Sequence, residues 1–211
     1  MFGNIDIAYK LFSIPAILLG FTFHEFAHAL VADRLGDRTP RFQGRLTLNP
    51  VVHIDIVGFI LIMLTGFGWA KPVQINPNAY KHYYKDDLKV SIAGPIANIL
   101  LAFVFAIITS IYTHFIYRYI PLYLSNPLKV ILLSIILTNC SLFVLNLIPI
   151  PGFDGFHILR DLSPAVFIKI EDALYQYQMI IWIALVFLLS NFISVPSYAL
   201  YNLFIKITML Q

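Results

Sequence analysis

The sequence contains few charged residues and almost no cysteine. Charged residues make up 12% of its 211 residues, whereas about 25% is usual in soluble domains. Hydrophobic residues reach 59%, and the mean hydropathy is +0.80. This balance excludes an ordinary soluble domain and indicates a polytopic membrane protein. Cys140 is the only cysteine, which excludes an intrachain disulfide, and its apolar surroundings predict a small core residue.

Further absences narrow the class of protein. The net charge is only +3 and the basic residues are spread over loops, so nucleic acid is not an expected partner. The sequence shows no internal repeat, although membrane transporters commonly have one. The first ten residues carry one lysine, and no small-residue cleavage site follows them. We therefore do not expect the first apolar run to be a removable signal peptide.

These features predict an all-α polytopic membrane protein with about four to six transmembrane helices joined by short loops. A single integral-membrane domain is expected over residues 1–211, with its core at 11–161 and C-terminal helices at 174–211. A proline at position 196 interrupts the end of the chain, so residues 198–210 either continue the preceding helix or form a separate short one. The predicted spans are residues 10–32, 88–117, 129–147 and 174–190.

Residues 57–70 form an apolar run that is short for a full span and predicts a re-entrant segment. If this run turns back, all eight basic residues from Arg34 to Lys89 lie on one side of the membrane. If it crosses, the basic residues divide seven against six, which carries no signal. The positive-inside rule therefore favours a re-entrant segment and a cytoplasmic basic face.

Residues 41–49 alternate polar and apolar side chains. This pattern predicts one or two short strands, or a hairpin, at the edge of the membrane. A strand edge at this place would be able to pair with an extended peptide. We therefore expect a short β element beside the membrane-spanning helices.

The sequence HEFAH occupies residues 24–28 inside an apolar run. Histidines four residues apart lie on one face of a helix, so both imidazoles can bind a single zinc ion. Glu25 is placed to take a proton from water at the metal as general base. Ionisable side chains are costly in a membrane helix and indicate a function. His28 is about six residues, or ~9 Å, from the charged end of the helix, which predicts a site close to one membrane surface.

A catalytic zinc site usually has three protein ligands and one open position. Asp154 is the favoured third ligand, because the prolines and glycines around it unwind the backbone and let its carboxylate face a protein-lined cavity. The alternative for Asp154 is a helix cap. His53, together with Asp55, is the rival ligand. His157 either supports the metal site or is a solvated interfacial histidine.

Asn98 and Asn146 are amides inside apolar helices. Each either forms a hydrogen bond between helices, worth roughly 1 kcal/mol or less, or holds an unwound substrate backbone near the zinc. The structural role is favoured for Asn98, and the two roles are balanced for Asn146. Both residues are therefore candidates for substrate binding.

Several motifs in this order resemble the site-2 protease family, the intramembrane zinc metalloproteases of peptidase family M50. The chain is similar to compact prokaryotic members without a PDZ or CBS domain, and the resemblance covers about residues 11–161. One departure is visible: many members have Pro-Leu before Asp-Gly, where this chain has Gly152 and Phe153, a change that would alter the pocket near the metal. The motifs are HEFAH at 24–28, LNP at 48–50, HID at 53–55, GWAKPV at 68–73, AGPIAN at 93–98 and NLIPIPGFDG at 146–155.

The resemblance implies that His24, His28 and Asp154 bind one zinc ion per chain, with Glu25 as the catalytic base. It also implies that Asn146 contacts the substrate. The expected location is the prokaryotic cell membrane, with several passes and an active site near the cytoplasmic face. The expected partners are the lipid bilayer and a transmembrane protein or peptide, such as a membrane-tethered regulator or a remnant signal peptide. The oligomeric state stays open.

Two other classes of function compete with an intramembrane protease. A proteolytically inactive membrane binding protein would keep the fold, but the presence of both Glu25 and Asp154 argues against it. A metal transporter would also bury histidine and aspartate, but the missing repeat argues against that class.

Overall fold

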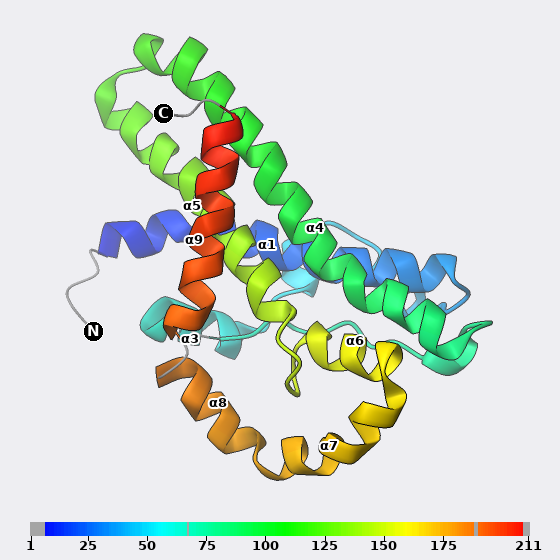
Figure 1. The fold of residues 1–211 in the computed structure, drawn as a ribbon. Helices are drawn as coiled ribbons and strands as arrows, with labels where there is room; N and C mark the ends of the chain where they lie inside the picture. The colour runs from blue at the N-terminus through cyan, green and yellow to red at the C-terminus, as the bar shows by residue number, and fades with distance from the viewer. Residues whose placement is uncertain (1–6, 67, 188–189, 209–211) are drawn as a thin grey trace.

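The structure is a computed structural model and describes residues 7–66, 68–187 and 190–208. The described residues are mainly helical, and short 3₁₀ and π turns join the helices. Figure 1 shows the course of the chain. The helices are α1 (Ile7–Arg34), α2 (Thr39–Phe42), α3 (Ile56–Thr65), α4 (Tyr83–Ile111), α5 (Leu122–Asn146), α6 (Asp154–Leu162), α7 (Pro164–Gln176), α8 (Gln178–Phe187) and α9 (Ser190–Ile207).

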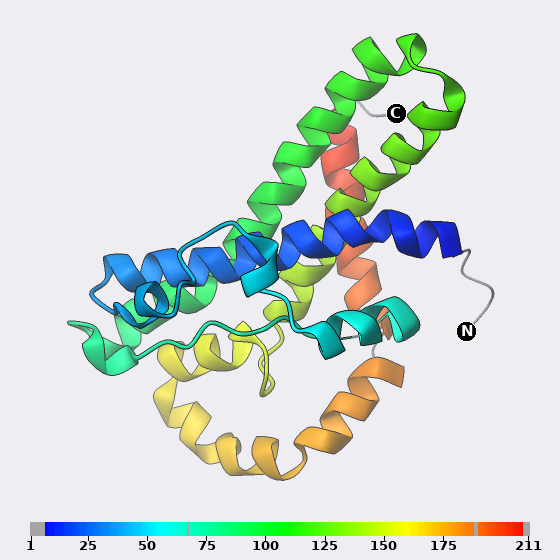
Figure 2. The ribbon, with the colours of Figure 1, turned by 180° about the vertical axis from the view of Figure 1, so that it is seen from behind.

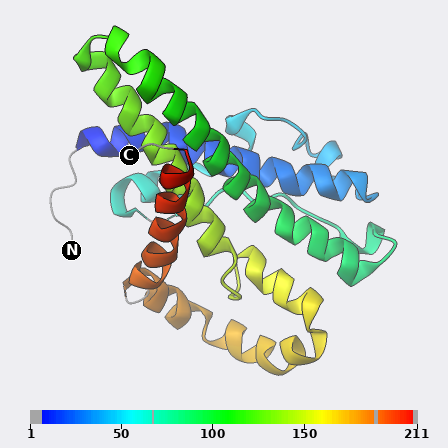
Figure 3. The same ribbon diagram turned by 45° about the horizontal axis from the view of Figure 1, so that its top comes forward.

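Helices α1, α4 and α5 form the centre of the molecule and pack against one another. In Figures 1 and 2, α4 and α5 run side by side and are joined at one end, while α1 crosses both. Helix α6 packs against α4, and α7 and α8 continue from it as an arch beyond the end of α5. Helix α9 lies along α5, as Figure 3 shows from a tilted view.

Three helical segments among the described residues are long and apolar enough to cross a membrane: Lys10–Arg34, Tyr83–Tyr119 and Leu122–Asn146. They correspond to the first three predicted spans. The all-helical class and the membrane character predicted from the sequence agree with this finding. A total of four to six spans stays a prediction, because the other apolar helices, such as α3 and the end of α9, are shorter.

The C-terminal region differs from the sequence-based expectation. The predicted span at 174–190 is not one helix: α7 ends at Gln176, and α8 begins at Gln178. Helix α7 turns its apolar face toward α6, where Phe167 packs edge-on against Phe156. Residues 188 and 189, at the end of that predicted span, lie outside the described residues. Helix α9 passes through Pro196 without a break, so residues 198–207 are not a separate helix.

The β element expected at residues 41–49 is not formed. Helix α2 covers its first residues, and turns and bends follow within this described segment. Pro40 occupies the start of α2, where a missing N–H costs least, and Gly44 adopts a positive φ of 69°. Arg45 then turns inward and donates to the carbonyl oxygens of Lys71 and Pro72 at 3.3 and 3.2 Å. The alternating pattern therefore reflects an irregular loop around one buried arginine.

Helix α3 and the chain that follows it form a tight return. The Lys71 N–H donates to the His53 carbonyl at 2.9 Å, and Ile54 pairs with Ala70 in an isolated antiparallel bridge. The helix has 10 residues, which is ~15 Å, about half of a hydrocarbon core of ~30 Å. Because both ends of the segment lie side by side, it has the geometry that a re-entrant segment requires.

The interior between α4, α5 and α9 contains an apolar cluster with no exposed surface. Ala102 and Ala106 on α4 face Ile136 and Cys140 on α5, and aromatic residues of α9 cover them. The prediction that Cys140 is a small core residue is confirmed. Small residues in this cluster let the helices approach closely.

Gly58 provides a test of the return of α3. A Cβ at this position would lie 2.2 Å from the Trp69 carbonyl oxygen, so Gly58→Ala forces α3 away from the segment that follows it. We expect the free energy of unfolding in detergent to fall by about 1–3 kcal/mol, measured by denaturant titration. Val57→Ala is the matched control, because Val57 is 60% exposed on the same helix. Equal stability of the Gly58→Ala variant and the wild type would contradict the close packing.

Candidate active site

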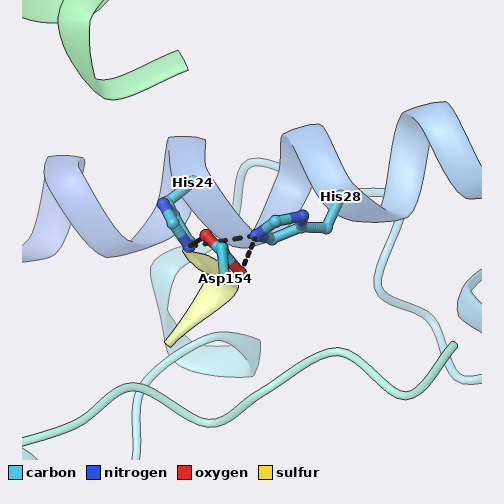
Figure 4. Close-up of side chains that lie close together, drawn as sticks. All are labelled: His24, His28 and Asp154. Atoms are coloured by element: carbon cyan, nitrogen blue, oxygen red, sulfur yellow. Dashed lines mark hydrogen bonds and ion pairs between the residues drawn. The ribbon is translucent and has the colours of Figure 1, made fainter. Parts of the chain in front are cut away.

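His24 and His28 lie one turn apart on α1 and point toward the same place. Their Nε2 atoms are 3.0 Å apart, and both side chains are buried. Figure 4 shows both rings on one face of α1, with Asp154 opposite them. The structure therefore brings together the three residues that the sequence nominates as metal ligands.

The Nδ1 atom of each imidazole is fixed by a hydrogen bond to a neighbouring oxygen. The His28 Nδ1 atom lies 2.7 Å from the Val90 carbonyl oxygen, and the His24 Nδ1 atom lies 2.7 Å from Asn98 Oδ1. A carbonyl oxygen can only accept a hydrogen bond, which assigns the proton to Nδ1 in both rings. Each Nε2 atom then presents a lone pair to the space between the rings.

Asp154 is the first residue of α6 and reaches the histidines from the opposite side. Its carboxylate oxygens lie 3.2 Å from His24 Nε2 and 3.3 Å from His28 Nε2, so the side chain faces the histidines instead of capping α6. The Asp154 carboxylate therefore faces the same space as the Nε2 atoms of both histidines.

The chain before Asp154 is bent by proline and glycine, as the sequence predicts. A Cβ on Gly155 would lie 2.5 Å from the carbonyl oxygens of Leu147 and Ile148, so only glycine lets α6 start this close to the end of α5. Gly152 has a φ of 99°, which L side chains rarely adopt. This turn places the Asp154 carboxylate opposite the two histidines of α1.

The departure at Gly152 and Phe153 has a structural counterpart on α8. Phe153 stacks on Trp182 with ring centroids 5.2 Å apart. A Cβ on Gly152 would meet the same indole ring at 2.6 Å. Trp182 therefore occupies the space beside the glycine and covers the turn that carries Asp154. A proline at position 152 fits neither this φ nor this contact.

The three side chains fit a bound zinc ion. Each offers one ligand atom, and these atoms lie within 4.8 Å of one another. All are electron-pair donors, and Asp154 Oδ2 is buried without a hydrogen-bond donor. Such a cluster needs a cation between its members, and two imidazoles with one carboxylate suit zinc. The rival ligand His53 lies outside this group among the described residues, where its Nε2 atom is 2.7 Å from the Thr47 carbonyl oxygen.

Glu25 lies beside the histidines and lines the same cavity of about 430 Å³. Its Oε2 atom accepts a hydrogen bond of 2.8 Å from the Val73 N–H. Val73 belongs to an extended segment whose preceding carbonyls are held by Arg45. The segment at 71–76, and not the one at 41–49, is therefore the extended chain beside the proposed base.

Asn146 and Asn98 occupy different places. Asn146 lines the cavity at the end of α5 and donates to the Leu142 carbonyl at 2.9 Å. Asn98 is fully buried beneath His24, and its amide bonds within the protein. A role in substrate binding therefore remains a proposal for Asn146, whereas the contacts of Asn98 point to support of His24.

A polar wall on the far side of the cavity escaped the sequence-based reasoning. Arg160 on α6 pairs with Asp87 on α4 and with Asp161, whose Oδ1 atom lies 2.8 Å from Arg160 Nε. His157 lines the cavity beside them and is exposed, in agreement with the solvated alternative. Burial raises the pKa of Asp161 to about 6. Asp87 near the start of α4 and Arg160 near the end of α6 are far apart in the sequence, and no local pattern predicts that they form an ion pair.

The approach of α4 to the histidines depends on Gly94. A Cβ at this position would lie 2.3 Å from His28 Nε2 and 2.6 Å from His24 Cε1. The small residues at 93–98, whose pattern predicts close helix packing, therefore contact α1 at the two histidines. Asn98 follows one turn later on the same helix.

Gly94→Ala is expected to displace both rings and to weaken metal binding. Because the Cβ would overlap the ligand atom itself, the affinity for zinc should fall by about 10-fold or more. Competition with a chromophoric chelator measures the affinity in detergent. Ile96→Ala is the control, because Ile96 is 46% exposed on the same helix. A Gly94→Ala variant that binds zinc like the wild type would refute this packing.

Comparison with known proteins places this chain in a family. The model of peptidase family M50 matches residues 12–124 and 121–190. A Bacillus subtilis protein named putative zinc metalloprotease YwhC is 40% identical over 151 residues, which are 72% of this chain and 68% of that protein. Putative zinc metalloprotease MJ0611 of Methanocaldococcus jannaschii is 29% identical over 75% of this chain and 74% of its own length.

A more distant relative is putative zinc metalloprotease Rip2 of Mycolicibacterium smegmatis, which is 29% identical over 156 residues. This match covers 70% of the chain and 55% of that relative. Among the solved structures, none matches the chain significantly. The family model covers well over half of the sequence, and the Bacillus subtilis relative is 40% identical over most of both chains. The chain therefore belongs to peptidase family M50.

Proposed function

We propose that this chain is an intramembrane zinc metalloendopeptidase of the site-2 type, which hydrolyses peptide bonds in or near transmembrane segments of membrane proteins. The observation that carries the proposal is the convergence of His24, His28 and Asp154 beside Glu25, in one cavity among helices of membrane-spanning length. Membership of peptidase family M50 and the zinc metalloprotease names of its relatives support a peptidase.

His24, His28 and Asp154 would hold one zinc ion, which when bound supplies a Lewis acid that polarises the peptide carbonyl and activates water. Glu25 takes the proton of the attacking water on its carboxylate and passes it to the leaving amine. The Val73 N–H orients that carboxylate, because its hydrogen bond to Oε2 fixes one oxygen and directs the group along the cavity. The chain thus supplies both the ligands and the proton carrier.

The substrate must present an extended peptide, since a helix hides its carbonyl groups in hydrogen bonds. Asn146 and the extended segment at 71–76 line the cavity and are the groups available to hold an unwound backbone. Membrane-tethered regulators and remnant signal peptides are substrates of this description. Regulated intramembrane proteolysis and signal-peptide clearance are therefore the proposed roles.

The proposed location is the cell membrane, with several passes and the active site near the cytoplasmic face. The polar wall of Asp87, His157 and Arg160 gives the cavity a hydrophilic side, which admits water. Asp87 of this wall lies between Lys85 and Lys89 in the sequence, and the positive-inside rule assigns the basic loops between Arg34 and Lys89 to the cytoplasm. The return of α3 keeps these loops on one side.

Glu25→Gln is expected to retain zinc and to lose cleavage by about 10²–10⁴-fold, because an amide cannot carry the proton. The measurement is zinc content by elemental analysis, together with cleavage of single-span membrane substrates by the purified protein. Glu171→Gln is the matched control, because Glu171 is the only other glutamate and lies on α7. Wild-type cleavage by Glu25→Gln would sink the proposed mechanism.

Asp154→Ala tests the third ligand in the same assays. Loss of one anionic ligand should lower the zinc content after dialysis and abolish cleavage, while Asp172→Ala on the exposed side of α7 should change neither. Full zinc binding by Asp154→Ala would move the third ligand elsewhere.

Metal removal provides an independent prediction. A strong chelator should abolish cleavage, and added zinc should restore it, whereas magnesium should not, since magnesium prefers six oxygen ligands to imidazole. Cleavage that survives complete zinc removal would contradict the assignment of a zinc enzyme.

A further inference from the structure

A chain of buried amides runs from α5 through α4 to His24. Asn98 Oδ1 lies 2.7 Å from His24 Nδ1, and Asn98 Nδ2 lies 2.9 Å from Asn139 Oδ1. Asn139 Nδ2 in turn donates to the Ile135 carbonyl at 2.8 Å. Both asparagines have no exposed surface. Three helices of the centre are therefore joined by one continuous line of hydrogen bonds that ends at a metal ligand.

Backbone carbonyls set the direction of this chain. The carbonyls of Ile135 and Gly20 can only accept, and each receives an N–H from an asparagine side chain. Both N–H groups of Asn98 are therefore used, one by Gly20 and one by Asn139, which leaves its oxygen toward His24. The His24 Nδ1 atom must donate to that oxygen, so Nε2 carries the lone pair.

Asn98 also forms hydrogen bonds to two groups on one turn of α1. Its oxygen binds the His24 ring, and its amide nitrogen binds the Gly20 carbonyl, one turn earlier on the same helix. Gly20 leaves room for the asparagines, because a Cβ there would lie 3.3 Å from Asn139 Oδ1 and 2.7 Å from Leu142 Cδ1. The ring orientation of His24 is therefore coupled to the position of α5.

We propose that Asn98 and Asn139 are positioning residues that hold His24 in the Nδ1-protonated tautomer and so set the affinity of the site for its metal. The inference rests on the proposed zinc function, but it assigns roles that the ligand set alone does not. Asn139 is neither a ligand nor part of the cavity lining, and it acts only through Asn98. A ligand whose second nitrogen is fixed in this way needs no rearrangement when the metal binds.

Leucine and aspartate substitutions separate a hydrogen-bonding role from a packing role. Leucine keeps the branching of asparagine at Cγ and replaces its polar atoms with methyl groups. An aspartic acid buried among apolar helices stays protonated, so its C=O and O–H reproduce both bonds of Asn139. The relay of hydrogen bonds from Asn139 through Asn98 to His24 therefore predicts that Asn139→Asp binds zinc better than Asn139→Leu. Simple packing among apolar helices predicts the reverse order.

The experiment is zinc affinity of the purified full chain, measured by competition with a chromophoric chelator. Asn98→Leu and Asn139→Leu should lose about 10- to 100-fold in affinity, and Asn139→Asp should stay within about threefold of the wild type. The double Leu variant should bind zinc no more weakly than Asn98→Leu, because Asn139 acts through Asn98. Thr109→Val is the matched control, since it removes a different fully buried polar group, a hydroxyl, from α4.

A second readout does not depend on metal or on proteolysis. Imidazole ¹⁵N shifts of the metal-free protein should show His24 protonated at Nδ1 in the wild type and in Asn139→Asp, but mixed in Asn139→Leu. If Asn98→Leu fails to fold, this comparison and the Asn139 affinities still decide. Leucine variants that bind zinc within about twofold of the wild type, or an Asn139→Leu variant that binds better than Asn139→Asp, would overturn the relay. A wild-type chain with fixed His24 but no zinc affinity would refute the proposed function and leave the relay standing.

Discussion

The structure depends on the mutual approach of three electron-pair donors among apolar helices. Two imidazole nitrogens and a carboxylate lie 3.0 to 3.3 Å apart at the meeting point of α1 and α6. Such a cluster is unfavourable without a cation, because like partial charges repel strongly where little water can screen them. The surrounding residues must therefore hold the lone pairs inward while the protein is without its metal.

Close helix contact makes this possible. Gly94 on α4 lies directly against the two histidine rings, and Gly155 lets α6 begin against the end of α5. The close approach at Gly94 also brings the Val90 carbonyl and the Asn98 amide of α4 within reach of His28 and His24. Small residues thus serve the chemistry of the site as well as the packing of the helices.

The two halves of the site are held by different means. The histidines sit on a long helix that α4 and α5 cover, and their second nitrogens are fixed by buried acceptors. Asp154 sits on a bent turn, which is held by the stacking of Phe153 on Trp182 and by the pairing of Arg160 with Asp87. Gly152 and Phe153, where the resembled pattern has Pro-Leu, therefore pack against Trp182 and support the turn that carries Asp154.

Local pattern alone predicted the two histidines of the candidate site and the membrane character of this chain. In any α-helix the two histidines of HEFAH lie one turn apart on the same face, so their pairing follows from the helical period. The long apolar runs favour packed membrane helices, so this prediction follows from composition. Tertiary structure decided what depends on partners distant in sequence. It buried Arg45 against carbonyls and turned an alternating segment into a loop, split the predicted span at Tyr177, and aligned Asn139 behind Asn98. No local pattern records these outcomes, because each depends on contacts with residues that are distant in the sequence and meet only in the folded chain.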